Sequence, residues 1–433
     1  MNLYTPGKGL FDTHVTWEDI EEDMQRELDT VASFGPNKTA KNIGDGKGFM
    51  SRIVLIDPDW QHKDKALPER FIVKILTQLA MQKLTKQVTQ KNGIENFFAK
   101  EDFMAAFERR QKLLHNVEVT LYSHIQRLPP GKIPSPKIYY MRKFSESNPV
   151  KGYIIMEYIE NFKVINVYEN VPLEAVREVL RAVAVMEAMS LKLSADEKEQ
   201  FTKNFFVELY GQFFNDEVAS LELTGKSLRA SVDEKLQDKV REVERFLKPL
   251  MDLPWADQLA DELGMERVIC HGDLWSTNLL WREDGASDVH LAAMIDFQTA
   301  NMGCPAGDLV RLFSACLSGK DRQRHWEELV EEFYGYLKEE VGNSKMPFTL
   351  EQLKESYTQF IPLGSFIVVT MIQPMYDTAC KNPNEEQKKK ILEDITEKME
   401  CLLDDIIFYY ERNLKLKREK QSKKECGISD CKF

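Results

Sequence analysis

The sequence predicts an α+β protein with two lobes, a small β-rich N-terminal lobe and a larger, mostly helical C-terminal lobe. Short apolar runs typical of strands occur over residues 40–76 and 152–158, whereas helical spacing dominates residues 160–265 and 325–412. At 433 residues, the chain is long enough to bury two substantial cores. We therefore expect an N-terminal extension with one helix (1–39), an N-lobe (40–157), a C-lobe (158–412) and a basic, disordered tail (413–433).

The bulk composition is that of an ordinary soluble globular protein, with 43% hydrophobic and 30% charged residues. The net charge of −12 argues against a nucleic-acid partner, because phosphate backbones are bound through Lys and Arg. The seven cysteines are scattered and the first residues lack a signal-peptide pattern, so we expect reduced thiols in the cytoplasm. The longest apolar run, around residues 363–372, is too short to span a bilayer, so no membrane insertion is expected. These features leave the oligomeric state open.

The N-terminal part of the chain combines one helix with a glycine-rich turn. Residues 16–31 join a capping-box pattern to apolar residues at helical spacing, which predicts a helix on the outside of the N-lobe. Gly44, Gly46 and Gly48 then lie between two predicted strands, where glycines allow backbone N–H groups to approach phosphates. A plain hairpin turn would also explain these glycines, and their spacing departs from the G-x-G-x-x-G pattern of a phosphate loop.

Lys74 stands inside an apolar run that is typical of a buried strand. A buried lysine is costly unless it is paired with an anion. We therefore expect Lys74 to meet nucleotide phosphates and a glutamate from the following helix. The helix predicted over residues 96–127 offers Glu101, Glu108 and Glu118 for this pairing.

The strand predicted over residues 152–158 ends where the two lobes would be joined. An adenine ring bound at this hinge would hydrogen-bond backbone groups, so side-chain identity matters little there. We assign Glu157 and Tyr158 to nucleotide binding on this basis. The long helical stretch between this hinge and His271 would provide a wall for a small substrate.

Two apolar runs are each followed by polar residues with the spacing of a phosphoryl-transfer site. The first ends at His271-Gly-Asp273, with Asn278 five positions after Asp273, and the second ends at Asp296. This is the order of a kinase catalytic loop and its metal-binding carboxylate. Asp273 would take the proton of an acceptor hydroxyl, a role worth roughly 10²- to 10⁴-fold. Asn278 and Asp296 would supply the oxygen ligands that Mg²⁺ prefers, although each residue alone could merely end a strand or cap a turn.

Two further residues are assigned to supporting the catalytic loop rather than to chemistry. His271 should orient the loop, and Asp308 should brace it through hydrogen bonds to its backbone. Cys270 beside His271 does not indicate zinc, because no second Cys/His pair at zinc spacing accompanies it.

The segment after Asp296 points to a small acceptor molecule. Only eight residues separate Asp296 from Pro305, and no Ala-Pro-Glu follows. A protein kinase uses a longer segment at this point to seat a peptide. Aromatic residues between 357 and 376 could line the acceptor pocket, but core positions explain them as well.

The amino-acid sequence around these residues resembles that of a known superfamily. The motifs His271–Asn278 and Ile295–Gln298 are similar to those of the aminoglycoside phosphotransferases and choline kinases. The longer sequence of residues 301–322 resembles nematode members of the CHK-kinase-like family, which are relatives of insect ecdysteroid-kinase-like enzymes. The resemblance extends over roughly residues 10–415. It implies a bilobal protein-kinase-like fold and ATP- and Mg-dependent phosphorylation of small hydroxylated molecules. It also favours Glu118 as the partner of Lys74, although a surface position would also suit that glutamate.

We therefore expect a small-molecule kinase, a phosphotransferase with an alcohol group as acceptor. A lipophilic steroid-like or xenobiotic acceptor is implied by the resemblance alone. Choline is disfavoured, because Gln298 stands where choline kinases would carry an acidic residue. The alternative is a catalytically inactive kinase-like binding or scaffold protein, which the irregular glycine spacing would permit.

Overall fold

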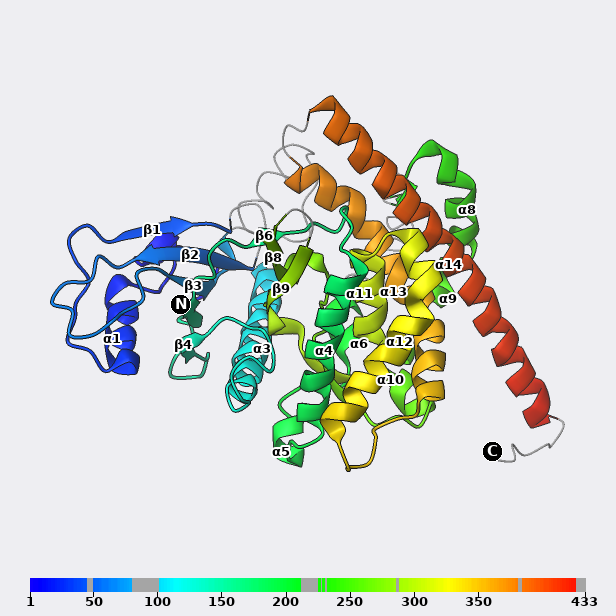
Figure 1. Ribbon diagram of the computed structural model, residues 1–433, viewed down its shortest axis with the longest axis horizontal. Helices are drawn as coiled ribbons and strands as arrows, with labels where there is room; N and C mark the ends of the chain where they lie inside the picture. The colour runs from blue at the N-terminus through cyan, green and yellow to red at the C-terminus, as the bar shows by residue number, and fades with distance from the viewer. Residues whose placement is uncertain are drawn as a thin grey trace. The chain divides into compact units, whose positions relative to one another are not determined.

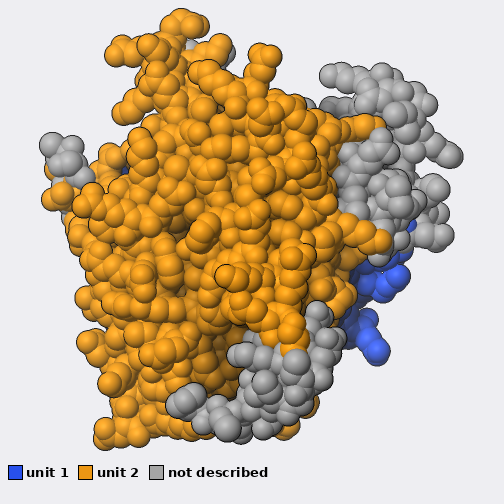
Figure 2. All heavy atoms as spheres, turned by 90° about the vertical axis from the view of Figure 1, so that its right-hand side faces the viewer, with its two compact units in different colours: residues 1–162, 292–300 blue, residues 163–291, 301–433 orange. Residues whose placement is uncertain are grey.

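The computed structural model forms two compact units. Unit 1 comprises Met1–Phe162 and Ala292–Ala300, and unit 2 comprises Lys163–Leu291 and Asn301–Phe433 (Figure 2). Unit 1 contains a five-stranded sheet and unit 2 is mostly helical (Figure 1), which confirms the predicted α+β class. The structure describes residues 1–44, 50–79, 101–211, 225–226, 228–229, 232–285, 288–380 and 384–425.

The sheet of unit 1 has the strand order β1-β2-β3-β5-β4, and every neighbouring pair is antiparallel. All six residues of β3, the central strand, are buried. The continuous apolar run around Lys74 therefore reflects a strand that is covered on both faces. The strands are β1 (Thr39–Asn42), β2 (Ser51–Asp57), β3 (Phe71–Leu76), β4 (Ile138–Arg142) and β5 (Tyr153–Glu157).

Helix α1 (Trp17–Leu28) covers one face of this sheet. It begins at the predicted capping box, in which the Thr16 hydroxyl accepts from the Asp19 backbone and the Asp19 carboxylate accepts from the Thr16 backbone. Alternate residues of β3 pack in the core beneath α1, so Lys74 lies on the opposite face of the strand. That face is covered by α3 (Glu101–Ile125), which also packs against η6 (Phe297–Thr299).

Unit 2 is built around long helices that pack side by side (Figure 1). The longest of them are α4 (Leu173–Ser190), α11 (Ala306–Cys316), α12 (Gly319–Val341), α13 (Leu350–Ala379) and α14 (Glu385–Glu425). Among the described residues, the shorter helices of unit 2 are α5 (Ala195–Lys198), α6 (Phe205–Tyr210), α8 (Gln237–Arg245), α9 (Leu247–Leu250) and α10 (Leu253–Glu262). The 3₁₀ turns in the described part of the chain are η1 (Leu10–Asp12), η4 (Glu234–Leu236), η5 (Ser276–Asn278) and η6.

Two small sheets accompany these helices. Strand β7 (Val268–Cys270) pairs antiparallel with β10 (Asn301–Gly303). The predicted catalytic-loop segment follows β7 in the chain, and α11 follows β10. A three-stranded sheet has the order β6-β8-β9. Its strands are β6 (Lys163–Val164), β8 (Leu279–Asp284) and β9 (Asp288–Met294).

Two features differ from the predicted organisation. The basic segment from residue 413, predicted to be a disordered tail, continues α14 as a helix to Glu425. Lys, Arg and Glu favour helices, so a charged composition alone did not indicate where this helix ends. Residues 292–300, predicted to belong with the C-lobe, are part of unit 1.

Helix α13 is long and apolar enough, over Leu350–Asp377, to cross a membrane by length and composition. However, 67% of its most apolar window is buried inside the protein, where α13 packs against α11 and α14. The aromatic residues Tyr357, Phe360 and Phe366 are buried on it, as expected of core positions. This single helix is therefore explained as part of a core, and nothing in the described residues indicates a membrane protein.

Lys398 fastens α14 to the rest of unit 2. Its side chain is fully buried, and its Nζ donates to the carbonyl oxygens of Val167 (3.0 Å), Glu169 (2.8 Å) and Ala315 (3.0 Å). Burial lowers the pKa of Lys398 to about 8. One ammonium thus joins three separate backbone positions, the last of them near the end of α11.

We expect Lys398→Met to lower the free energy of unfolding by about 3 kcal/mol, because buried carbonyls lose their donor. Since the folded pKa lies below the unfolded value of 10.5, the unfolded chain binds more protons between about pH 8 and 10.5. This group therefore makes the protein more stable as pH rises through that window, and the variant should lack that rise. Urea denaturation at several pH values measures both effects. Lys389→Met, at an exposed position, is the control, and equal stability of the two variants would contradict the prediction.

Candidate active site

Unit 1 brings three of the predicted site residues together. The Lys74 ammonium donates to both carboxylate oxygens of Glu118, at 2.8 and 2.7 Å, and to Asp296 Oδ1 at 2.7 Å. Lys74 and Glu118 are buried, whereas the Asp296 side chain is 30% exposed. Glu108, another of the candidate partners, instead pairs with Lys112 on the same helix.

The charges in this cluster do not balance. Burial opposes the charged form of Lys74, but the neighbouring Asp296 and Glu118 carboxylates raise its pKa above the ordinary value. Burial and the charge of Asp296 raise the pKa of Glu118 against the attraction of Lys74. With the three groups ionised, the cluster carries a net charge of −1, and its most exposed member is the Asp296 carboxylate. A cation at Asp296 therefore fits the charge of the residues present.

Asp296 has an unusual backbone conformation, which sets the direction of its side chain. Its φ of 65° and ψ of 59° lie in the left-handed region, which aspartate tolerates better than most residues, and they end β9 abruptly. The next residue, Phe297, packs edge-on against Tyr122 of α3, with ring centres 5.1 Å apart. Contacts to α3 thus hold the segment that carries Asp296.

In unit 2, Asp308 braces the catalytic-loop segment. Its buried carboxylate accepts from the backbone N–H groups of His271 (2.6 Å) and Gly272 (2.9 Å). Gly272 has a φ of 80°, which favours glycine at this turn. His271 is fully buried, and its Nδ1 accepts from the backbone N–H of Asp273 at 3.3 Å. Both residues therefore contact the loop in the way that their supporting assignments require.

The carboxylate of Asp273 is held by side chains on both of its oxygens. Oδ2 accepts from Trp275 Nε1 and from Asn278 Nδ2, each at 3.0 Å. Oδ1 accepts from Arg311 Nη1 at 3.2 Å. The side chain is 23% exposed, so it is held in place without being closed off from solvent.

Asn278 is oriented by its contacts with Asp273. Its Nδ2 also donates to the Asp273 carbonyl oxygen at 2.8 Å. Because both partners of this amide are acceptors, its NH₂ group must face them, which turns its Oδ1 the other way. An amide oxygen in that orientation is suited to a hard cation. The described residues contain no group of three or more His, Cys, Asp or Glu side chains that could hold a metal ion, so such a cation would need further oxygen ligands from a bound molecule.

The other residues predicted to bind the nucleotide are the glycines after β1 and two residues at the end of β5. Gly44 lies beside Ile53 at the end of β1, while Gly46 and Gly48 fall outside the described residues. At the predicted hinge, the Glu157 N–H donates to the Lys137 carbonyl and the Glu157 carboxylate accepts from the Lys137 N–H. The ring of Tyr158 contacts the Arg70 guanidinium. The Glu157 N–H is therefore already used within the sheet region and is not the group that an adenine would meet.

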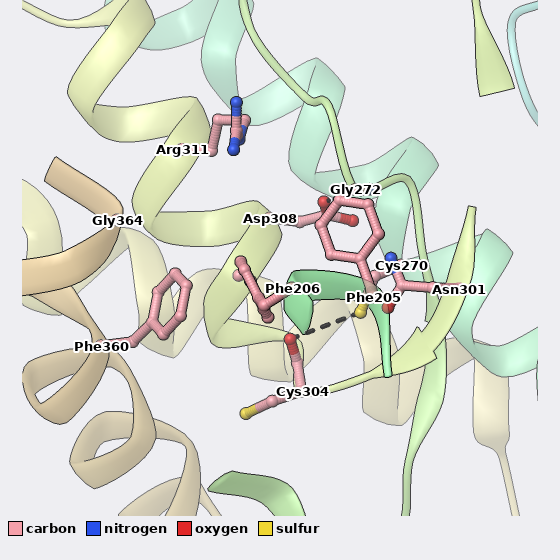
Figure 3. A pocket seen from close by; sticks show the side chains of 11 residues that line it. Phe205, Phe206, Cys270, Gly272, Asn301, Cys304, Asp308, Arg311, Phe360 and Gly364 are labelled. Carbon is pink, nitrogen blue, oxygen red and sulfur yellow. Dashed lines mark hydrogen bonds between the residues drawn. The ribbon is translucent and has the colours of Figure 1, made fainter. Parts of the chain in front are cut away.

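A cavity adjoins the catalytic loop within unit 2 (Figure 3). It is small, with a volume of about 20 Å³, which is room for about one water molecule. Phe206 of α6 and Phe360 of α13 both line it and pack against each other, with ring centres 5.2 Å apart and ring planes tilted by 51°. Cys270 and Cys304 line its other side, where the Cys270 thiol donates to the Cys304 carbonyl. The walls are thus mainly aromatic and apolar.

Residues 3–414 match the family described as "Uncharacterized oxidoreductase dhs-27". The chain belongs to this family. The Caenorhabditis elegans protein of that name is 23% identical over 317 residues, which cover 72% of this chain but only 36% of the relative. The chain thus spans about a third of that relative's length. "Uncharacterized kinase-like protein D1044.1" of Caenorhabditis elegans is 26% identical over 295 residues, covering 67% of this chain and 75% of the relative.

Solved structures similar to this member of the dhs-27 family are those of small-molecule kinases. A choline kinase from Cryptosporidium parvum Iowa II is 14% identical and covers 88% of this chain and 91% of its own, with a TM-score of 0.40. The ADP-bound aminoglycoside phosphotransferase APH(2'')-Ib is 12% identical and covers 90% and 99%, with a TM-score of 0.36. The family match and the relative named as kinase-like confirm the predicted resemblance. These distant likenesses say nothing of this chain's substrate.

Sequence reasoning missed three side chains that surround the Asp273 carboxylate, namely Trp275 of the loop, Arg311 of α11 and Tyr210 of α6, which supports Arg311. Arg311 stands in the apolar run Leu309-Val-Arg-Leu-Phe313, where a buried cation would need an anion. That signal was available, but it does not name Asp273 as the partner. No sequence pattern marks Tyr210, because it lies in a helical region without distinctive residue spacing.

The buried Asp308 carboxylate is a titratable group in direct contact with the predicted catalytic loop. Burial raises its pKa to about 6 from an ordinary value of 3.8, while the His271 and Gly272 N–H groups oppose the shift. Arg311 and Asp273 are the charged groups that act on it, and burial together with the charge of Asp308 raises the pKa of the nearby Glu187. Below about pH 6, protonation would remove one of the acceptors that brace the loop.

We therefore expect turnover to fall on the acid side, with a midpoint near pH 6. The free energy of unfolding should show the opposite trend, because the contribution of Asp308 to it falls as pH rises. The folded state binds more protons than the unfolded state between pH 3.8 and about 6, so this group's contribution falls by about 3 kcal/mol as pH rises through that window. Asp308→Asn should remove this slope from the unfolding free energy measured by urea denaturation. An unchanged slope in the variant would show that other groups cause it.

Proposed function

We propose that this protein transfers the γ-phosphoryl group of MgATP to a hydroxyl group of a small molecule. The observation that carries the proposal is the buried Lys74, held by Glu118 and Asp296 in the central strand of unit 1. A paired lysine of this kind, together with an acidic metal ligand, serves to hold and neutralise a triphosphate. The net negative charge of the cluster and the partly exposed side chain of Asp296 support a role in binding the metal that accompanies the nucleotide.

The residues of the loop are assigned as follows. Asp273 accepts the proton of the acceptor hydroxyl, whose oxygen forms a bond to the γ-phosphorus. The bond from that phosphorus to the bridging oxygen breaks, and ADP leaves with the electron pair. Asn278 Oδ1 and the Asp296 carboxylate would hold Mg²⁺, which when bound neutralises charge on the phosphates. Lys74 meets the phosphates as a fixed positive charge.

The short segment after Asp296 supports a small acceptor. It consists of η6 and β10, and α11 already begins at Ala306. That length leaves no extended platform on which a peptide could lie. The cavity beside Gly272 has room for about one water molecule, so it does not by itself hold such an acceptor.

The proposed function also includes a cytoplasmic location and excludes dinucleotide-dependent oxidoreductase activity. The five cysteines of the described residues are free thiols, which supports a location in the reducing cytoplasm. The word oxidoreductase in the relative's name is not carried over, because this chain covers 36% of that protein. The sequence also contains no G-x-G-x-x-G of the kind that binds a dinucleotide.

The test combines binding with turnover. MgATP should raise the melting temperature, because a ligand that binds only the folded state stabilises it by mass action. Incubation with γ-labelled ATP and a metabolite extract should then yield a labelled product, identifiable by mass spectrometry. A melting shift without any labelled product would favour the alternative, a catalytically inactive binding protein. The absence of both would refute the proposal.

A further inference from the structure

Helix α11 contacts the catalytic loop through two residues of one face. Asp308 and Arg311 are three positions apart, so their side chains lie on the same side of the helix. Asp308 holds the backbone at His271 and Gly272, whereas Arg311 holds the side chain of Asp273. One helix thus fixes both where the loop runs and where its carboxylate lies.

Arg311 is itself held from several sides. It is 5% exposed, and its Nη2 donates to the Tyr210 hydroxyl at 2.7 Å while Nη1 reaches Asp273 Oδ1. Its guanidinium lies 5.1 Å from the centre of the Trp275 ring. Trp275 in turn donates to the other oxygen of Asp273, which closes a ring of contacts around that carboxylate. In Figure 3 the guanidinium points away from the Phe206 and Phe360 rings of the cavity.

Tyr210, the outer member of this group, stands on a helix that is fixed in turn. The Asp257 carboxylate of α10 accepts from the backbone N–H groups of Phe206 (2.8 Å) and Val207 (3.0 Å), which caps the start of α6. Burial raises the pKa of Tyr210, against the opposing charge of Arg311, so its hydroxyl stays neutral. The chain of contacts runs from α10 through α6 to Arg311 and the carboxylate.

We infer that Arg311 is a positioning residue for the phosphoryl-transfer reaction, which fixes the plane of the Asp273 carboxylate with Tyr210 as its support. This inference rests on the proposed function. A forked guanidinium can hold one carboxylate oxygen and a hydroxyl at once, which a lysine ammonium does with less fixed geometry. A buried cation is costly unless it is paired, and the contact of Arg311 with Asp273 offsets part of that cost.

The experiment measures phosphate release from MgATP, with water as acceptor, and product formation in the metabolite extract. Arg311→Ala should lower kcat by about 10- to 100-fold, part of what a positioned base contributes, and leave the KM for ATP unchanged. Guanidinium chloride, far below denaturing concentrations, should restore several-fold of the lost rate, since it can occupy the vacated space. Arg311→Lys and Tyr210→Phe should lose less. The matched control is Arg322→Ala, which removes another buried arginine paired with an aspartate, Asp405, between α12 and α14.

The outcomes separate the two claims. A parent protein that releases no phosphate and labels no product refutes the proposed function, and this inference with it. An active parent whose Arg311→Ala variant keeps its kcat refutes the inference alone. A loss that guanidinium does not relieve, or relieves equally in Arg322→Ala, also refutes it, because it would reflect stability. If Arg311→Ala does not fold, Arg311→Lys and Tyr210→Phe decide: unchanged kcat in both overturns the inference.

Discussion

Asp273→Asn is expected to reduce kcat by roughly 10²- to 10⁴-fold, the contribution of a positioned general base. The amide has nearly the shape of the carboxylate but cannot accept the acceptor's proton. It also places an NH₂ group against donors, because both oxygens of Asp273 accept hydrogen bonds from Trp275, Asn278 and Arg311. Steady-state kinetics with a product identified from the extract would measure the loss.

The same variant should keep its response to MgATP. Lys74, Glu118 and Asp296 all belong to unit 1, whereas Asp273 belongs to unit 2, and the Lys74 ammonium is held by Glu118 and Asp296. The melting shift with MgATP should therefore match that of the parent within error. Asp261→Asn serves as the control, since the Asp261 side chain is 60% exposed in its pair with Arg267 and the change should not affect turnover. Full activity in Asp273→Asn would remove the residue from the proposed chemistry.

The part of the site that could be predicted is the part in which a charge must be buried. Lys74 lies in an apolar strand, so an anionic partner was required, and Glu118 is one residue that the structure places against it. Asp308 was likewise expected to brace the loop, and its carboxylate accepts from two loop N–H groups. In both cases, elementary electrostatics limited the choices before any coordinates were known.

What could not be predicted are pairings between distant parts of the sequence. Arg311 follows Asp273 by 38 positions, and no local pattern indicates that helix α11 would turn the guanidinium toward that carboxylate. Tyr210 lies 101 positions before Arg311, in a short helix whose place depends on the cap from Asp257. Sequence spacing describes one helix or strand at a time, whereas these contacts depend on how several helices pack.

The assignment of residues 292–300 to unit 1 has the same origin. In the sequence they follow the catalytic-loop segment closely, which suggested the C-lobe. Asp296 instead pairs with Lys74, and Phe297 packs against Tyr122. Two strong contacts of adjacent residues thus outweigh proximity along the chain.

Lys74→Met is expected to destabilise unit 1 by about 3–5 kcal/mol, because it leaves Glu118 buried without its partner. The MgATP-dependent melting shift should also disappear, since the charge that meets the phosphates is gone. Chemical denaturation and thermal shift measure the two losses separately. Lys112→Met is a matched control on the same pattern: Lys112 pairs with Glu108 on α3 but is only partly buried, so about 1 kcal/mol or less should be lost.

The double variant Lys74→Met with Glu118→Leu separates folding from function. A buried ion pair can often be replaced by apolar side chains of similar volume with little loss or even a gain in stability. The double variant should therefore recover most of the stability that Lys74→Met loses, while nucleotide binding and turnover stay absent. Recovery of both would mean that the pair only supports the fold. Recovery of stability alone would mean that the lysine is retained at a cost to folding because a bound anionic ligand requires its charge.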